Sequence, residues 1–328
     1  IGEPQLPQFN QLIEIPTESN SRIEIIKKNS RVINLNNYSN LKVVPSQSSI
    51  PKTINNAIEF QYDEAFYNEN KFTDNDLVEI ENLGKLREVE IGNVTVNPFQ
   101  YNPKTNELII HTEINFNIHF DNANIILSKD NKNKFASPYF ESIFNTSLIN
   151  YESPYKIENQ IRQNNFINDD VTYLIIANST FEGYLDEFIE WKSKKGYNVV
   201  VAYTNEIGSS SSSIKAYIQE QYNNPENNLS APSFVLLVGD TQQLPVSYTS
   251  GGHVSDLDYC NLSGNDIPEV LCGRFSAQTP SHLQAQIEKT MQYEQYTMPD
   301  PSFLGDVILI SGVDASYAPT YGNGQINY

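Results

Sequence analysis

The hydrophobic pattern of the chain has a two-residue period in its first half and a helical period in its second half. In the first half, residues 88–96 and 107–120 alternate apolar and polar side chains. The second of these segments places four apolar side chains on one face, Ile114, Phe116, Ile118 and Phe120. Such alternation predicts half-buried antiparallel strands in a β-rich, sandwich-like or barrel-like body. Turn-forming residues at Asn102–Asn106 predict a hairpin between the two segments.

From about Asp169 onwards, continuous apolar strands alternate with amphipathic helices. The predicted strands are Val171–Ala177, Tyr197–Tyr203, Phe234–Val238, Val270–Phe275 and Val307–Ser311. One predicted helix begins near Ser179, which forms a capping-box pattern with Glu182, and another covers Pro280–Tyr296. Apolar strands that alternate with helices predict a doubly wound, largely parallel sheet.

Phe234–Val238 reads as the central strand of that sheet, because five apolar residues in a row are typical of a strand buried on both faces. Asp240 follows it directly, and Asp314 follows the last predicted strand in the same way. Chemistry in open α/β sheets lies just beyond the carboxyl ends of the strands. Both carboxylates are therefore candidates for the functional edge of the sheet.

A polar, aperiodic segment at Ser137–Asn165 is predicted to connect the two halves. We place the domains at residues 1–165, a β-rich body with its connector, and 166–328, an α/β body. Arg162 lies in the most polar part of the connector, where a protease could reach it. An ordinary linker between domains is the alternative interpretation.

Composition narrows the possible partners. The formal net charge is −19, from 40 acidic and 21 basic residues among 328, which argues against nucleic acid as a partner. No apolar run approaches the roughly 20 residues of a membrane span. The chain begins at Ile1 without a methionine, which we interpret as a processed N-terminus from which a targeting segment has been removed.

The residues alone leave three kinds of chemistry to consider for this protein. Nucleotide binding is disfavoured, because Ser179–Phe181 stands where a glycine-rich loop would follow the first strand, and no P-loop lysine is present. A metal site is the second possibility, because four acids cluster in and around one loop, Asp240, Asp256, Asp258 and Asp266. Carboxylate oxygens suit calcium, although a solvated acidic loop explains the cluster equally well.

Nucleophilic catalysis by a cysteine is the third possibility. His253 and Cys260 share a loop, but a catalytic pair needs contact in space rather than proximity in sequence. Cys272 lies in an apolar strand and is expected to be a small buried hydrophobe. Two cysteines do not make a disulfide framework, so they leave the cellular compartment open.

Several segments of the second half resemble, in order, the catalytic domain of the gingipain-like cysteine peptidases. The matching segments are Tyr173–Ala177, Phe188–Lys192, Val235–Asp240 and Gly273–Ser276, followed by Gln286–Ile287 and Tyr293–Glu294. The first half resembles the family's β-rich propeptide, from Gly2–Pro4 to Pro98–Pro103. The resemblance covers nearly the whole chain and implies a propeptide followed by an α/β, caspase-like peptidase domain with a mostly parallel sheet, truncated in this chain.

The resemblance also assigns roles to individual residues. Asp314 matches the acid that orients the catalytic histidine, while that histidine and the nucleophilic cysteine are expected beyond Tyr328. Gln325 matches a pocket position that carries an acid in arginine-specific members, so strict specificity for basic residues is not implied. This fragment alone is expected to be inactive.

The implied function is that of a secreted or cell-surface bacterial cysteine endopeptidase zymogen. Its expected partners are protein or peptide substrates, its own propeptide as inhibitor, and the remainder of the catalytic domain. Family members carry structural calcium, which makes the acidic loop a candidate site for that ion, and catalysis itself needs no cofactor. The alternative is a non-catalytic adhesion or binding protein on the same scaffold.

Overall fold

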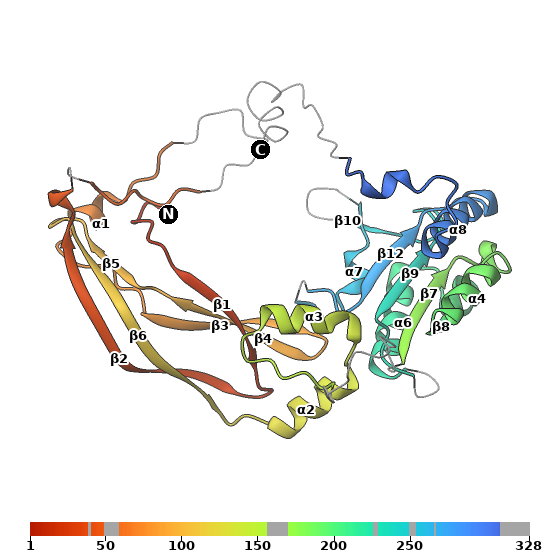
Figure 1. The fold of residues 1–328 in the computed structure, drawn as a ribbon, viewed down its shortest axis with the longest axis horizontal. Coiled ribbons are helices and arrows are strands. Elements are labelled where there is room, and N and C mark those ends of the chain that lie inside the picture. Colours follow the sequence, from red (N-terminus) through yellow and green to blue (C-terminus); the bar gives the residue numbers. More distant parts are fainter. Residues whose placement is uncertain are drawn as a thin grey trace.

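The computed structural model describes residues 1–38, 41–48, 59–155, 170–225, 229–248, 254–265 and 267–308. The first half of the chain forms a β-rich body and the second half an α/β body (Figure 1). This confirms the predicted change of fold class along the chain. None of the helices in these ranges is long and apolar enough to cross a membrane.

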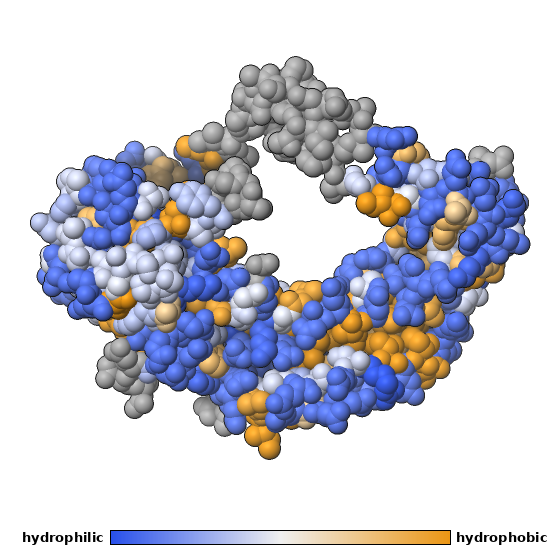
Figure 2. Space-filling model, turned by 180° about the vertical axis from the view of Figure 1, so that it is seen from behind, coloured by the Kyte–Doolittle hydropathy of each residue, from blue (hydrophilic) through white to orange (hydrophobic). Residues whose placement is uncertain are grey.

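Two three-stranded antiparallel sheets build the β-rich body, with orders β1-β4-β3 and β2-β6-β5. Their strands are β1 (Phe9–Ile15), β2 (Asn20–Asn34), β3 (Val78–Leu86), β4 (Val89–Val96), β5 (Phe99–Asn102) and β6 (Glu107–Asp121). Ile13, Ile15, Val78 and Val94 of the first sheet form a buried cluster, and the predicted apolar face of β6 packs against it. The β6 side chains are only partly buried, and apolar surface is visible on this body from behind (Figure 2).

The predicted hairpin between residues 88–96 and 107–120 is wrong for the first of these two segments. Asn102–Asn106 does form a turn, in which the Asn102 carboxamide oxygen accepts hydrogen bonds from the backbone N–H groups of Lys104 and Thr105. The turn joins β5 to β6, however, whereas β4 pairs with β1 and β3 in the other sheet. The chain leaves the first sheet at Asn97–Pro98, where proline cannot donate a ladder hydrogen bond.

The connector contains a helix that its composition concealed. The helical elements of the first half are η1 (Leu35–Asn37), α1 (Glu64–Asn68), α2 (Ile125–Lys134) and α3 (Pro138–Ser147). In α3, Pro138 occupies the first turn, where its missing N–H costs nothing. Phe140 and Phe144, four residues apart, are buried against β3 and β4 residues. This single pair of phenylalanines is too short a pattern to stand out in an Asn- and Ser-rich segment.

The α/β body is built on a four-stranded parallel sheet of order β12-β9-β7-β8. Its strands are β7 (Val171–Ala177), β8 (Tyr197–Tyr203), β9 (Phe234–Val238) and β12 (Leu271–Phe275). A two-stranded ribbon, β10 (Ser247–Tyr248) with β11 (Val254–Ser255), lies outside it. As predicted, β9 is an interior strand, and four of its five residues are buried.

Helices cover both faces of this sheet, so the predicted doubly wound arrangement is confirmed. The helical elements are η2 (Ser179–Phe181), α4 (Asp186–Lys194), α5 (Thr204–Ile207), α6 (Ser211–Asn223), α7 (Leu257–Cys260), α8 (Pro280–Gln295) and η4 (Ser302–Gly305). Leu174 and Ile176 of β7 face α6 in one apolar cluster. Ile175 of the same strand faces α4 and α8 in the other cluster. Alternate residues of one strand thus fill two separate cores.

Two local predictions in this half need correction. The helix after β7 begins at Asp186 and not near Ser179, which instead opens a short 3-10 turn capped by Asn178. Gly183 separates the two pieces, with a left-handed φ of 79° that no helix interior adopts. Val307 and Ile308 are not in a strand, and the rest of the predicted last strand lies outside the described residues.

Candidate active site at the carboxyl edge of the sheet

The carboxyl ends of the parallel strands form the edge where α/β proteins place their chemistry. Polar residues follow three of the strands directly or after one residue: Asn178 after β7, Asp240 after β9 and Ser276 after β12. The backbone N–H of Asp240 donates to the carbonyl of Ala277 at 2.9 Å, which ties the two loops together beyond the strands. The edge is therefore a connected surface.

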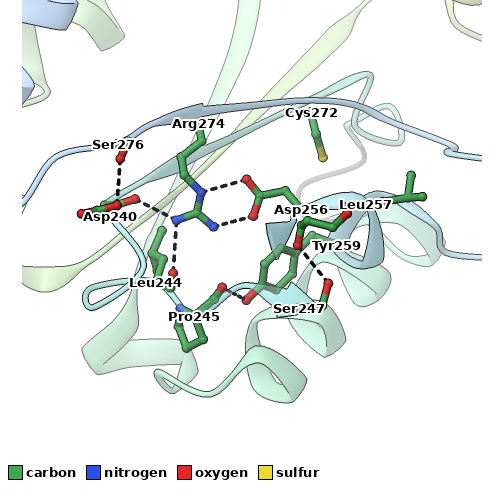
Figure 3. A network of polar contacts seen from close by, with 12 residues as sticks. Asp240, Leu244, Pro245, Ser247, Asp256, Leu257, Tyr259, Cys272, Arg274 and Ser276 are labelled. Carbon is green, nitrogen blue, oxygen red and sulfur yellow. Dashed lines mark hydrogen bonds and ion pairs between the residues drawn. The ribbon is translucent and has the colours of Figure 1, made fainter. Parts of the chain in front are cut away.

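Both carboxylate oxygens of Asp240 are held by neighbouring side chains. One accepts a hydrogen bond from the Ser276 hydroxyl at 2.9 Å (Figure 3). The other accepts a hydrogen bond from the Gln278 carboxamide at 2.6 Å. These donors lower the pKa of Asp240, with Gln278 the largest cause, the Thr241 backbone N–H next and Ser276 third. Asp240 is therefore a fixed, ionised group at neutral pH.

The side chain of Arg274, which lies in β12, joins two loops at the same edge of the sheet. Its Nε and Nη2 donate to the two carboxylate oxygens of Asp256 at 2.8 and 2.6 Å, while Nη1 donates to the carbonyls of Gly239 at 2.7 Å and Leu244 at 3.2 Å (Figure 3). Gly239 has a φ of 142°, and a Cβ there would lie 2.8 Å from that of Gln243, so this turn requires glycine. One guanidinium thus fixes the β9 turn to the loop that carries Asp256.

The segment beyond Asp256 is fastened in two further ways. The Tyr259 hydroxyl donates to the carbonyl of Pro245 at 2.6 Å. Cys260 forms a disulfide with Cys272 of β12. The expectation that Cys272 is a small buried hydrophobe is wrong. Cys272 is exposed, because β12 is the edge strand of the described sheet. With both sulfurs in a disulfide, neither cysteine supplies a thiolate in this form.

The predicted acidic cluster is only partly assembled. Asp240 and Asp256 lie on opposite sides of Arg274, and their oxygens are occupied by the donors described above (Figure 3). Among the residues that the structure describes, no three acidic, histidine or cysteine side chains come together as a metal site. These two carboxylates therefore do not fit a calcium ion, and the prediction of calcium rests on Asp258 and Asp266.

Five residues singled out in the sequence lie outside the described ranges: Arg162, His253, Asp266, Asp314 and Gln325. Their roles stay predictions.

Sequence reasoning missed the function of Arg274 at this edge. The signal was an arginine as the fourth residue of an otherwise apolar strand. A buried charge requires partners, so the position itself pointed to an ion pair. The partner could not be identified, because Asp256 lies 18 positions earlier in a loop without periodicity.

A parallel sheet covered on both faces, with a β-rich body ahead of it in the chain, defines a two-part α/β protein whose chemistry belongs at the carboxyl edge. Two family descriptions match its two parts: residues 1–158 match Propeptide_C25, and residues 167–327 match Peptidase family C25. The chain belongs to peptidase family C25 and carries the family's propeptide ahead of peptidase-domain sequence. This confirms the resemblance read from the sequence.

Relatives with known names match along the whole chain. Lys-gingipain HG66 of Porphyromonas gingivalis is 31% identical over 334 residues, which cover 100% of this chain and 19% of that protein. Gingipain R1 of the same organism is 28% identical over 330 residues, covering 99% of this chain and 31% of that protein. The chain thus spans about a fifth to a third of the length of these relatives. A structure described as showing zymogenic latency of gingipain K is 30% identical, with a TM-score of 0.36 over 38% of this chain and 68% of that one.

Proposed function

We propose that this chain is the propeptide and part of the peptidase domain of a cysteine endopeptidase made as a zymogen. The observation that carries the proposal is the match of two consecutive segments to the family's propeptide and peptidase. The two segments differ in fold class, one with antiparallel sheets and one with a parallel sheet, as a propeptide and an enzyme would. The substrates are proteins or peptides.

In the proposed mechanism, a cysteine thiolate attacks the peptide carbonyl carbon and a histidine protonates the leaving amine. Both residues come from sequence beyond Tyr328. Asp314 accepts a hydrogen bond from one ring nitrogen of that histidine and leaves the other free for proton transfer. Gln325 lines the substrate pocket, where an uncharged amide gives no strong preference for a basic side chain.

The residues of the described edge have supporting roles. Arg274 and the Cys260–Cys272 disulfide hold the loops that follow β9 and precede β12. A catalytic constellation loses rate when its supporting shell moves by about 1 Å, so such bracing suits an enzyme. The same bracing would serve a binding protein, so it does not carry the proposal.

Three further features belong to the proposal. The propeptide inhibits the enzyme, and a cut in the connector, with Arg162 as one candidate site, allows the two parts to separate. The protein acts outside the bacterial cell, secreted or on its surface. A structural calcium ion binds near Asp258 and Asp266. A melting temperature that a chelator leaves unchanged would contradict this calcium site.

The test is peptidase activity of the full-length protein after activation, with and without a thiol-alkylating reagent. Activity that alkylation abolishes supports the enzyme. Activated protein without hydrolysis of any peptide in a mixed-sequence library would favour the alternative, an adhesion or binding protein on the same scaffold.

A further inference from the structure

Arg87 stands at the tip of the β3–β4 hairpin in an unusual backbone conformation. Arg87 has a φ of 48° and the next residue, Glu88, a φ of 63°. Two consecutive left-handed residues form a tight hairpin turn that normally carries Asn or Gly. Neither Arg87 nor Glu88 is a residue that favours this conformation. We infer that the contacts of the Arg87 side chain, rather than the turn, account for the arginine at this position.

The Arg87 guanidinium is buried against the α/β body. Its side chain is 1% exposed. Nη1 donates to the carbonyls of Pro232 and Glu269, each at 2.9 Å, and Nη2 donates to the carbonyl of Ala231 at 3.3 Å. Nε donates to the carbonyl of Phe135, between α2 and α3, at 2.7 Å. Three of these four acceptors belong to the peptidase part of the chain.

Two aromatic rings and a buried acid complete the surroundings. The guanidinium carbon lies 5.0 Å from the ring centre of Phe140 and 5.5 Å from that of Tyr222. Burial lowers the pKa of Arg87, while the field of the Glu269 carboxylate, itself 1% exposed, favours the charged form. An arginine stays protonated in such a setting. The site is therefore built for a planar cation.

This site lies on the edge of the sheet opposite to the candidate active site. Ala231 and Pro232 precede β9, and Glu269 precedes β12, so their carbonyls stand at the amino ends of these strands. Asp240 and Ser276 follow the carboxyl ends of the same two strands. Figure 1 shows the β3–β4 hairpin reaching toward the amino ends of β9 and β12 beside α3.

Contacts around Arg87 make this a continuous interface. The hydroxyls of Ser137 and Ser233 are 2.7 Å apart, and the Asn265 carboxamide donates to the carbonyl of Lys85 at 2.6 Å. The Tyr139 ring meets that of Phe234 edge-on, with centres 4.6 Å apart. A fully desolvated arginine ringed by such contacts has the anatomy of an interface hot spot.

We propose that the peptidase domain carries a guanidinium-binding pocket at the amino edge of its sheet, built by the carbonyls of Ala231, Pro232 and Glu269 and the ring of Tyr222. Arg87 fills this pocket and is the anchor that retains the propeptide after the connector is cut. The ligand class is an arginine side chain presented on a tight hairpin turn. This inference rests on the proposed function only in taking residues 1–158 as a propeptide that can separate.

Guanidinium specificity follows from the geometry. The four hydrogen bonds diverge from three nitrogens in one plane, and a lysine ammonium offers three donors from a single point. Lysine in place of Arg87 leaves part of the carbonyl ring unpaired. Removal of the guanidinium leaves all the carbonyls buried without a donor, the costly case for a desolvated polar group.

The experiment uses the full-length protein with a specific protease site inserted in the connector between residues 155 and 170. After the cut, the dissociation rate of the propeptide is measured for the parent, Arg87→Lys and Arg87→Ala. We expect dissociation on the order of 100-fold faster for Arg87→Ala and about 10-fold faster for Arg87→Lys. Arg31→Ala, which removes an exposed arginine from β2, is the matched control and should leave the rate unchanged.

Chemical rescue distinguishes a guanidinium pocket from general loss of packing. Added N-ethylguanidinium should slow dissociation of Arg87→Ala, and ethylammonium at the same concentration should not. If Arg87→Ala does not fold, two single variants test the same pocket: Tyr222→Leu changes its wall and Arg87→Lys changes its ligand. The propeptide should dissociate faster from each of them than from the parent. A parent-like rate for Arg87→Lys, equal effects of the two cations, or pieces that separate only on unfolding in every variant would each overturn the proposal.

None of these readouts needs catalysis. If the protein has no peptidase activity but shows the expected dissociation rates, the proposed pocket is supported and the proposed function is wrong. If the protein is an active peptidase but the propeptide dissociates at the same rate in all variants, the proposed function is supported and the proposed pocket is wrong.

Discussion

Arg274 and Asp256 form a two-point ion pair, with both carboxylate oxygens bound by two nitrogens of one guanidinium at 2.6 and 2.8 Å. The side chains are 12% and 28% exposed, so the pair is largely shielded from water. Its remaining nitrogen holds the carbonyls of Gly239 and Leu244. The pair therefore ties β12 to two loops of the candidate active-site edge, the one that follows β9 and the one that carries Asp256, and its loss should loosen both loops.

Replacing Arg274 with lysine should lower the free energy of unfolding by about 2–3 kcal/mol, because a lysine cannot keep the two-point pair and the two carbonyl contacts together. Urea denaturation of the full-length protein measures this. Lys194→Ala is the control, because its pair with Glu190 is about two-thirds exposed on both sides. We expect the control to change stability by less than about 0.5 kcal/mol. Equal losses in the two variants would contradict the role given to Arg274.

The Cys260–Cys272 disulfide should protect both sulfurs from alkylation. Treating the unreduced, denatured protein with iodoacetamide should leave the peptides that contain Cys260 and Cys272 unmodified, and prior reduction should label both. The bond closes a loop with a sequence separation of 12. Cys272→Ser with Cys260→Ser should therefore cost about 3 kcal/mol of stability. Alkylation of either residue without reduction would show that they are free thiols.

Glu294 should make stability depend on acid pH. Its oxygens accept from Lys192 at 2.7 Å, Lys195 at 2.9 Å and the Trp191 indole at 2.8 Å. Burial raises the pKa of Glu294, but hydrogen bonds from these three side chains outweigh it, so the pKa is lowered from the ordinary value of 4.5. A depressed folded-state pKa means that the stabilisation is fully present above the unfolded value and disappears as pH falls through the folded value.

We therefore expect Glu294→Gln to lose about 2–4 kcal/mol at pH 7 and to show a shallower loss of stability below about pH 4.5. Glu288→Gln, on the same helix, is the control. Melting temperatures measured from pH 7 to pH 3 would reveal the difference. A Glu294→Gln curve parallel to that of the parent would mean that this carboxylate is not held as described.

Asp314→Asn should leave the fold intact and lower kcat of the activated full-length enzyme, because the amide no longer fixes the catalytic imidazole as the carboxylate does. By analogy with serine-protease triads the loss could reach ~10⁴, and an enzyme whose thiolate is already nucleophilic should lose less. Asp306→Asn, at an exposed position shortly before, is the control. Full activity of Asp314→Asn across neutral pH would make Asp314 a turn residue only.

The elements predicted best from the sequence are those whose pattern is local. The alternation around Phe116 identifies a half-buried strand, and the apolar run before Asp240 identifies an interior strand. Both depend on which face of a strand is buried, and periodicity reports that directly. The same information places Asp240 just beyond the carboxyl end of β9, where the structure has it.

Contacts between distant segments were not predictable in this way. Arg87 contacts Glu269 across 182 positions, and Cys260 pairs with Cys272, which lies in the edge strand of the described sheet. No local pattern states which loop an arginine will enter. From the sequence, Arg87 in its tight turn could be interpreted only as an exposed polar residue, because turns ordinarily lie in solvent.

In the proposed function, residues 1–158 are a propeptide that keeps a cysteine endopeptidase latent. The most direct measurement is the peptidase activity of the purified full-length protein before and after the connector is cut, with N-terminal sequencing of the active product. We expect little activity before cleavage, thiol-dependent activity once the cut propeptide has dissociated, and a new N-terminus between Gln163 and Asp170. Equal activity before and after cleavage, or a mature chain that begins well inside β7, would contradict it.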